Sequence, residues 1–249
     1  MKKTLSIIKG LFLMIVASTL GYFSISQLLS YGQAKHSTTD LTELVDVTQR
    51  FIAQPKAAEI IPLFGFDADV SNGAEFHFSD MSDVSYNPQT SFSLSQGGNG
   101  FTTNQFDRKR EVEKFEQSIS AFHDSLASDT IGREHSAVYF PIAESLNALS
   151  KSTADKKILL VYSDLMENET DLSFYDRKTL ALLACDPEKI KAILLAKDPL
   201  ANLSGIEIHF VYQPENAQAD STFRLVSAFY KKLLEEKGAT VFISANLTK

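Results

Sequence analysis

The sequence predicts an α/β protein with a doubly wound, mostly parallel sheet that carries helices on both faces and follows an N-terminal hydrophobic helix. In the second half of the chain, short apolar or aromatic runs alternate with amphipathic helical patterns, which is typical of this class. The runs that begin at Ile158 and Val241 are apolar over successive residues, as expected for strands covered on both faces. Ligands of such folds bind at the carboxyl ends of the strands.

Residues 1–34 are predicted to be a signal peptide or a membrane anchor. Three lysines precede an uncharged, apolar stretch from Leu11 to about Leu29, which approaches the ~20 residues needed to span a bilayer. Gly32 and Ala34 provide the small residues of a cleavage site, so both alternatives stay open. In either case the rest of the chain is expected outside the cytoplasm, periplasmic or extracellular, with membrane contact through this segment only.

The remainder of the chain is acidic. The formal net charge of −7 becomes −10 without residues 1–34, because that segment holds three lysines and no acid. Nucleic acid is therefore not expected as a partner, since binding to phosphates needs clustered Lys and Arg. Cys185 is the single cysteine, which excludes an intrachain disulfide and a zinc site built from cysteines.

Residues 58–249 are expected to form one domain, and residues 35–57 a linker with a short helix. That helix is predicted from apolar residues at helical spacing between Leu41 and Val45, with Asp40 as its cap. Strands are predicted at the runs 60–66, 74–80, 91–94, 157–164, 206–213 and 239–246. Amphipathic helices are predicted at 107–126, 136–150 and 221–237, and a further helix at 187–196.

Aspartate and serine residues follow two of the predicted strands. Asp80 and Ser82 come at the end of one strand and Asp164 at the end of another, while Ser136 begins the helix that precedes the second strand. Each residue also has a structural interpretation, as a turn former or a helix cap. Because all four side chains offer hard oxygen atoms, they are predicted to bind an octahedral Mg²⁺ or Mn²⁺ ion and not zinc.

This order of elements resembles a von Willebrand factor A-type (VWA) domain, a Rossmann-like fold, over roughly residues 58–247. The metal-ion-dependent adhesion site of that family has a D-x-S-x-S turn after the first strand, a distant threonine, and an aspartate that ends the fourth strand. Asp80-Met81-Ser82 matches the first half of the turn, Ser136 stands in place of the threonine, and Asp164 matches the aspartate.

The sequence also departs from the family's pattern. Val84 replaces the second serine of the turn, and Leu165 replaces the glycine that usually follows the aspartate. A serine, Ser136, stands where the family has threonine. The predicted metal site is therefore degenerate, and a metal-free scaffold with the same fold is the alternative.

The resemblance implies an extracytoplasmic binding module for protein–protein interaction, and no enzymatic activity. It implies that Asp80, Ser82 and Ser136 ligate a Mg²⁺ or Mn²⁺ ion directly, and that Asp164 does so through water. An acidic residue of an unidentified protein partner is then expected to complete the coordination of the metal.

A rival first turn lies in the segment FDADVS (66–71). With Asp67 as nucleophile and Asp69 as general acid, this turn is close to that of haloacid-dehalogenase-like phosphatases. Against this alternative, no paired acidic motif follows near a later strand, and Pro62 in the preceding run disfavours a central strand. The phosphatase is the weaker alternative.

The histidines and one acidic segment are not assigned to the metal site. His77 and His209 fall within predicted strands and are interpreted as structural residues. The segment 167–171 (ENETD) is interpreted as a solvated acidic loop.

Overall fold

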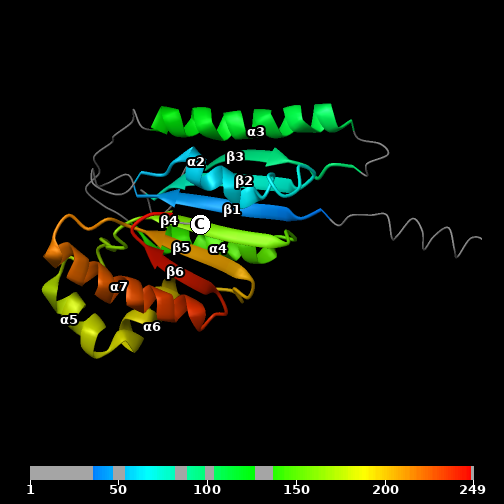
Figure 1. Ribbon diagram of the computed structural model, residues 1–249. Helices are drawn as coiled ribbons and strands as arrows, with labels where there is room; N and C mark the ends of the chain where they lie inside the picture. Colours follow the sequence, from blue (N-terminus) through cyan, green and yellow to red (C-terminus); the bar gives the residue numbers. More distant parts are fainter. Residues whose placement is uncertain (1–35, 47–53, 82–88, 99–103, 127–136, 248–249) are drawn as a thin grey trace, which may run out of the picture. The chain divides into compact units, whose positions relative to one another are not determined.

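A six-stranded sheet forms the centre of the computed structural model, which describes residues 36–46, 54–81, 89–98, 104–126 and 137–247 (Figure 1). The strands are β1 (Thr38–Val45), β2 (Gly73–Asp80), β3 (Gln89–Leu94), β4 (Lys156–Tyr162), β5 (Ile206–Val211) and β6 (Thr240–Ser244). Their order is β3-β2-β1-β4-β5-β6, and the pairing of β2 with β3 is antiparallel while the others are parallel. This is the order of a doubly wound sheet, so the predicted α/β class is confirmed.

Internal contacts divide the chain into two units. One unit comprises residues 36–97 and 103–249 and contains the whole sheet. The other, residues 1–35 with 98–102, falls almost entirely outside the described residues, and so do the predicted hydrophobic helix and its signal or anchor role. None of the helices in the described part of the chain is both long enough and apolar enough to cross a bilayer.

Helices cover both faces of the sheet (Figure 1). On one face, Phe78 of β2 and Phe92 of β3 contact Phe122 of α3 (Gln105–Leu126). On the other face, Phe210 of β5 contacts Tyr230 of α7 (Ala217–Glu235), which in turn contacts Tyr139 of α4 (Tyr139–Lys151). Successive side chains of a strand point to opposite faces, so the continuously buried residues of β4 contribute to both layers of the core.

Four further helical segments complete the unit. The short helices are α2 (Ala57–Ile60), the 3₁₀ helix η1 (Ile61–Phe64), α5 (Arg177–Cys185) and α6 (Pro187–Lys197). Phe64 of η1 packs edge-on against Phe115 of α3, and α5 contacts both α6 and α7. The predicted helices at 107–126, 136–150, 187–196 and 221–237 are thus found as α3, α4, α6 and α7, whereas α5 was not predicted.

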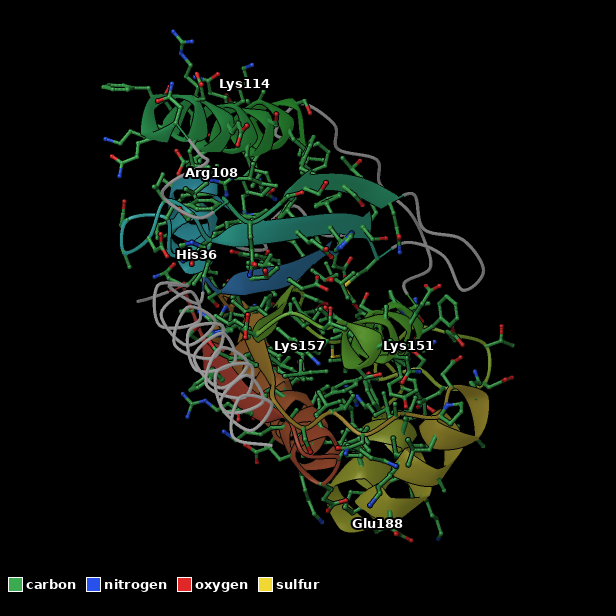
Figure 2. The ribbon with its side chains drawn as sticks, turned by 90° about the vertical axis from the view of Figure 1, so that its right-hand side faces the viewer. His36, Arg108, Lys114, Lys151, Lys157 and Glu188 are labelled. Atoms are coloured by element: carbon green, nitrogen blue, oxygen red, sulfur yellow. The ribbon has the colours of Figure 1, made fainter. Side chains whose placement is uncertain are left out.

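Arg108 joins α3 to the turn before β2 (Figure 2). This arginine is buried, and its guanidinium donates to the carbonyls of Val70 (2.9 Å) and Asn72 (2.6 Å) and to the carboxylate of Glu111 (3.0 Å). A buried guanidinium needs several acceptors to offset the loss of its hydration. These contacts therefore fix the position of α3 over the β2 side of the sheet.

The prediction of a linker and short helix over residues 35–57 is wrong for residues 38–45. These residues form the central strand β1, which is buried along almost its whole length and pairs with both β2 and β4. Asp40 is a strand residue and not a helix cap. The alternation expected of a strand is hidden because polar residues, including Asp40 and Glu43, are buried together with Leu41 and Leu44.

The run 60–66, predicted to be a strand, instead contains the end of α2 and the helix η1. Pro62 lies in the first turn of η1, where a missing N–H does no harm, and Gly65 ends η1 with a left-handed φ of 72°. A proline cannot donate to a strand ladder, so this segment favours the helical turn.

Candidate functional site

Three aspartates lie at the carboxyl ends of three adjacent parallel strands. Asp46 directly follows β1, Asp80 is the last residue of β2, and Asp164 lies just after β4. The strand β1 lies between β2 and β4, and Val45 is paired with Asp80 on one side and with Tyr162 on the other. The three strand ends therefore form one edge of the sheet, the edge where doubly wound folds bind ligands.

Short hydrogen bonds order the loop that carries Asp164. Ser163 Oγ donates to Asp46 Oδ2 at 3.1 Å and accepts from the Leu165 N–H at 2.9 Å. The Met166 N–H donates to Asp164 Oδ1 at 2.9 Å. Such side-chain-to-backbone bonds replace a regular ladder at the end of a strand. The Ser163 hydroxyl thus links the end of β1 to the end of β4.

The donor atoms at this edge are carboxylate and hydroxyl oxygens in a largely buried setting. Asp46 is 2% exposed and Asp164 is 6% exposed. Buried carboxylates need hydrogen bonds or a cation to offset their lost hydration, and oxygen donors of this kind suit Mg²⁺ or Mn²⁺. Among the described residues, however, these aspartates do not form a cluster of three with oxygen atoms within 4.8 Å of one another.

The four predicted metal ligands divide into two groups. Asp80 and Asp164 lie at the carboxyl edge, as the sequence predicted. Ser82 and Ser136 fall in the segments 82–88 and 127–136, which the structure does not describe. The structure therefore brings two of the four residues to a common edge and leaves the ligand set as a prediction.

One part of the predicted motif requires correction. Asp80 ends β2, whereas the first strand of the described residues is β1, which is followed by Asp46. The sequence pattern does not point to Asp46, because the apolar spacing of residues 41–45 predicts a helix and not a strand. A signal was present in the sequence, since Asp46-Val47-Thr48 has the same spacing of aspartate and hydroxyl as Asp80-Met81-Ser82.

The rival turn with Asp67 and Asp69 lies elsewhere. It precedes Gly73, the first residue of β2, which is paired with Thr38, the first residue of β1. The turn is thus at the amino end of these strands, opposite Asp164. Asp69 is bonded to His36 at 2.7 Å, and this hydrogen bond lowers the pKa of Asp69.

Glu167 is not a solvated loop residue as the sequence suggested, because it is buried and caps the N-terminus of α4. Its carboxylate accepts the backbone N–H groups of Val138 (3.1 Å) and Tyr139 (2.7 Å). Burial raises the pKa of Glu167 to about 7, although the two N–H groups oppose that shift. The loop after Asp164 is therefore fastened to the helix that follows segment 127–136.

Leu165 has a left-handed φ of 61°, the one positive φ outside glycine in the described part of the chain. This is the position where the VWA pattern has glycine. The conformation costs a residue with a Cβ ~1–2 kcal/mol. The Leu165 side chain is nevertheless fully buried in the core, which offsets the strain.

The strain at Leu165 predicts that a glycine substitution is tolerated better than an alanine substitution. Leu165→Gly is expected to be less destabilising than Leu165→Ala by ~1 kcal/mol, because both lose the buried side chain but glycine alone relieves the strain. Urea unfolding of both variants measures the difference. An alanine variant as stable as the glycine variant, or more stable, would contradict strain at this position.

Comparisons with known proteins give no family for the chain. No known protein family matches it, and no curated protein matches its sequence. Solved structures that align with it include a mutant of the PilB minor pilin from Streptococcus sanguinis, with 9% identity and a TM-score of 0.45, over 86% of this chain and 59% of that chain. The pilus adhesin SpaC from Lactobacillus rhamnosus GG aligns with 11% identity and a TM-score of 0.36, over 83% of this chain and 30% of that chain.

A third alignment is with an aerotolerance-related membrane protein from Bacteroides fragilis, with 8% identity and a TM-score of 0.33, over 82% of this chain and 90% of that chain. The chain therefore spans less than two thirds of the first two proteins. At these identities and scores, the alignments assign no function. The fold class rests on the strand order and pairing described above.

Proposed function

We propose that this protein is a VWA-like binding module that recognises a protein partner through the carboxyl edge of its sheet. The observation that carries the proposal is the placement of Asp46, Asp80 and Asp164 at the ends of three adjacent parallel strands. Their oxygen atoms suit a Mg²⁺ or Mn²⁺ ion, which would supply the positive charge that attracts an acidic residue of the partner.

The proposed ligands combine the sequence pattern with the observed first strand. Asp46 takes the place of the aspartate in the turn after the first strand, and Asp164 that of the aspartate after the fourth strand. Hydroxyl ligands would come from Ser136 and from Thr48, which follows Asp46 at the spacing at which Ser82 follows Asp80. The hydrogen bond between Ser163 and Asp46 supports this assignment because it orients one carboxylate relative to the loop of the other.

The proposal includes a location outside the cytoplasm. The three lysines and the apolar stretch of residues 1–34 support it, as either a cleaved signal or a retained anchor. The acidic character of the remainder supports a protein as the partner, and not nucleic acid.

Calorimetric titration with Mg²⁺ and Mn²⁺ tests the metal site. We expect binding to be weakened about tenfold or more in Asp164→Asn, because the charge is lost while the amide oxygen still accepts the Met166 N–H. Asp171→Asn is the matched control, since this carboxylate lies in the same loop and is 70% exposed. Equal affinities of Asp164→Asn and the wild type would contradict the assignment.

Each alternative function predicts a different experimental result. A metal-free scaffold with this fold predicts no saturable binding of Mg²⁺ or Mn²⁺, and partner capture that chelators leave unchanged. A haloacid-dehalogenase-like phosphatase predicts turnover of an aryl phosphate that depends on Asp67. That activity has little support, because Asp67 and Asp69 lie at the amino end of β2, away from Asp164.

A further inference from the structure

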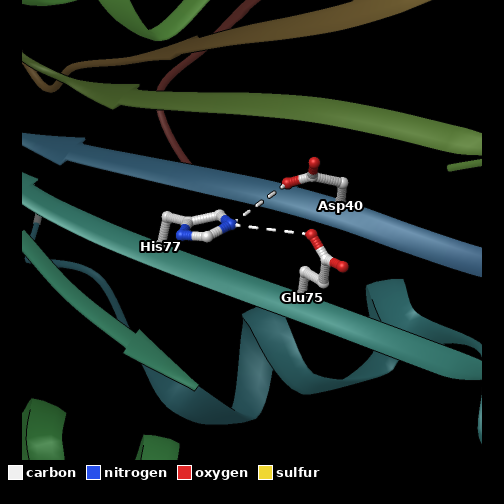
Figure 3. A group of neighbouring side chains, drawn as sticks. All are labelled: Asp40, Glu75 and His77. Atoms are coloured by element: carbon white, nitrogen blue, oxygen red, sulfur yellow. Dashed lines mark ion pairs between the residues drawn. The ribbon is translucent and has the colours of Figure 1, made fainter. Parts of the chain in front are cut away.

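We propose that Asp40, Glu75 and His77 form a second cation site, on the face of β1 and β2 turned toward α4, which binds a divalent transition-metal ion of the zinc class. Figure 3 shows the imidazole of His77 directed at both carboxylates. One ligand atom of each residue lies within 4.8 Å of the corresponding atoms of the other two. The proposal is independent of the Mg²⁺ or Mn²⁺ site at the carboxyl edge.

The register of the sheet creates this cluster. Asp40 of β1 is paired with Glu75 of β2, and His77 lies two residues further along β2, so all three side chains emerge on one face. The intervening Phe76 points to the other face, where it contacts His123 of α3. Asp40 lies six residues before Asp46, which is ~20 Å along a strand. The two proposed metal sites are therefore separate.

Asp40 provides an independent sign that a ligand belongs here. Its side chain is only 8% exposed, and its Oδ1 is buried without a hydrogen-bond partner among the described residues. This oxygen faces His77 Nε2 at 3.7 Å, and Glu75 Oε2 lies 3.9 Å from the same nitrogen. Both distances are too long for hydrogen bonds. A buried carboxylate oxygen in this state is a strong acceptor for a cation placed between the three groups.

The distances between His77 Nε2 and the two carboxylates leave room for a metal ion between them. Ligands bound at ~2.1 Å with tetrahedral angles lie ~3.4 Å apart, only slightly closer than the 3.7 and 3.9 Å that separate His77 Nε2 from the Asp40 and Glu75 oxygens. The other described histidines that face carboxylates are in direct contact: His36 with Asp69 at 2.7 Å, His123 with Glu43 at 2.9 Å, and His209 with Glu207 at 2.6 Å. His77 is thus the described histidine that stands apart from its carboxylates.

Ser91 of β3 orients the imidazole. Its hydroxyl lies 2.9 Å from His77 Nδ1, and the two residues are paired in the register of β2 and β3. When Nδ1 carries the proton and donates it to Ser91, the lone pair of Nε2 faces Asp40 and Glu75. Metal-binding histidines are commonly oriented by such a bond on the other ring nitrogen.

The ligand types select the class of ion. One imidazole nitrogen and two carboxylates favour zinc or a neighbouring transition metal over Mg²⁺, which prefers oxygen ligands alone. The three groups line a cavity of about 600 Å³ between the sheet and α4, which also includes Ser145 and Lys151; Figure 2 marks Lys151. A fourth coordination position can therefore be filled by water from this cavity.

The test is a titration of the untagged full-length protein, first freed of metal with a chelator, with Zn²⁺ alone. We expect one saturable site per chain, and an affinity about tenfold or more lower in His77→Gln and in Asp40→Asn. Ser91→Ala is expected to weaken binding less. His209→Gln is the matched control, because His209 also lies in a strand and contacts a glutamate, and it should leave the affinity unchanged.

Thermal unfolding provides a second, independent measurement. Saturating Zn²⁺, at 100 times the dissociation constant of the wild type, is expected to raise the unfolding temperature of the wild type by roughly 5–10 °C and that of His77→Gln by about half as much or less. This comparison also shows that the variant is folded. The proposal is overturned by an absence of saturable Zn²⁺ binding, by equal binding in His77→Gln, or by Zn²⁺ binding that depends on Asp164 and not on His77.

Discussion

Replacing His123 by leucine is expected to lower the free energy of unfolding by about 3–5 kcal/mol, because it leaves a buried carboxylate without its partner. Glu43 lies in the middle of β1 with a fully buried side chain, and His123 Nε2 on α3 is 2.9 Å from Glu43 Oε2. The other ring nitrogen, Nδ1, donates to the carbonyl of Ile119 at 2.8 Å. The imidazole is thus held between two acceptors.

The pKa shifts of this pair explain why the partners depend on each other. Burial raises the pKa of Glu43, and the hydrogen bond with His123 opposes that shift. For His123, burial lowers the pKa, but the hydrogen bond and the charge of Glu43 outweigh it, so the pKa of His123 is raised. In His123→Leu the carboxylate is expected to take up a proton, and the variant should regain part of its stability at acidic pH.

The double variant Glu43→Met with His123→Leu separates the ion pair from simple packing. Removing both partners leaves no buried charge, so the loss of stability should be much smaller than the sum of the two single losses. The Ile119 carbonyl remains satisfied in the double variant by the helical backbone. Guanidinium unfolding of the wild type, both single variants and the double variant measures this coupling. Additive effects would contradict a mutually dependent pair.

The stability of the protein is also expected to fall by about 3 kcal/mol between pH 4.5 and pH 7 through Glu167 alone. The pKa of Glu167 is about 7 in the folded protein, raised by burial from its ordinary value of 4.5. Over this interval the unfolded chain has lost the proton while the folded protein keeps it. The folded state therefore binds more protons, and the free energy of unfolding decreases as the pH rises, levelling off above pH 7.

The variant Glu167→Gln isolates this contribution from that of every other titrating group. The amide stays neutral, and its oxygen can still accept the Tyr139 N–H that Glu167 now binds at 2.7 Å. The variant is expected to gain about 3 kcal/mol relative to the wild type between pH 5 and pH 8, measured by urea unfolding at both values. Asp171→Asn is an exposed change in the same loop, so its free energy of unfolding should vary with pH as that of the wild type does. If the stability of Glu167→Gln varied with pH in the same way as that of the wild type, the raised pKa of the buried Glu167 carboxyl would be contradicted.

Much of the second half of the fold follows from local sequence patterns. The run Ile158–Tyr162 is continuously apolar and forms the buried strand β4, while the +3/+4 apolar spacing of α3 and α7 produces one buried stripe on each helix. These patterns depend only on which residues lie on one side of a strand or helix. They also placed Asp164 correctly at the end of a strand.

The central strand could not be recognised in this way. Its burial includes Asp40 and Glu43, which no local pattern predicts for the interior of a sheet. The group that neutralises Glu43 is His123, 80 residues further along the chain. Because the apolar spacing of residues 41–45 predicts a helix, the sequence alone does not place Asp46 at the edge of the sheet.

The sequence by itself determined the α/β class, most helices and strands after residue 73, and the aspartates at the ends of β2 and β4, because periodicity and turn chemistry are local. Only the tertiary structure decided that residues 38–45 form the middle strand, that Asp46 joins the carboxyl edge, and that Asp40, Glu75 and His77 share one face. The reason is that strand register brings residues far apart in the chain side by side. The packing of α3 on the sheet likewise places His123 against the buried charge of Glu43.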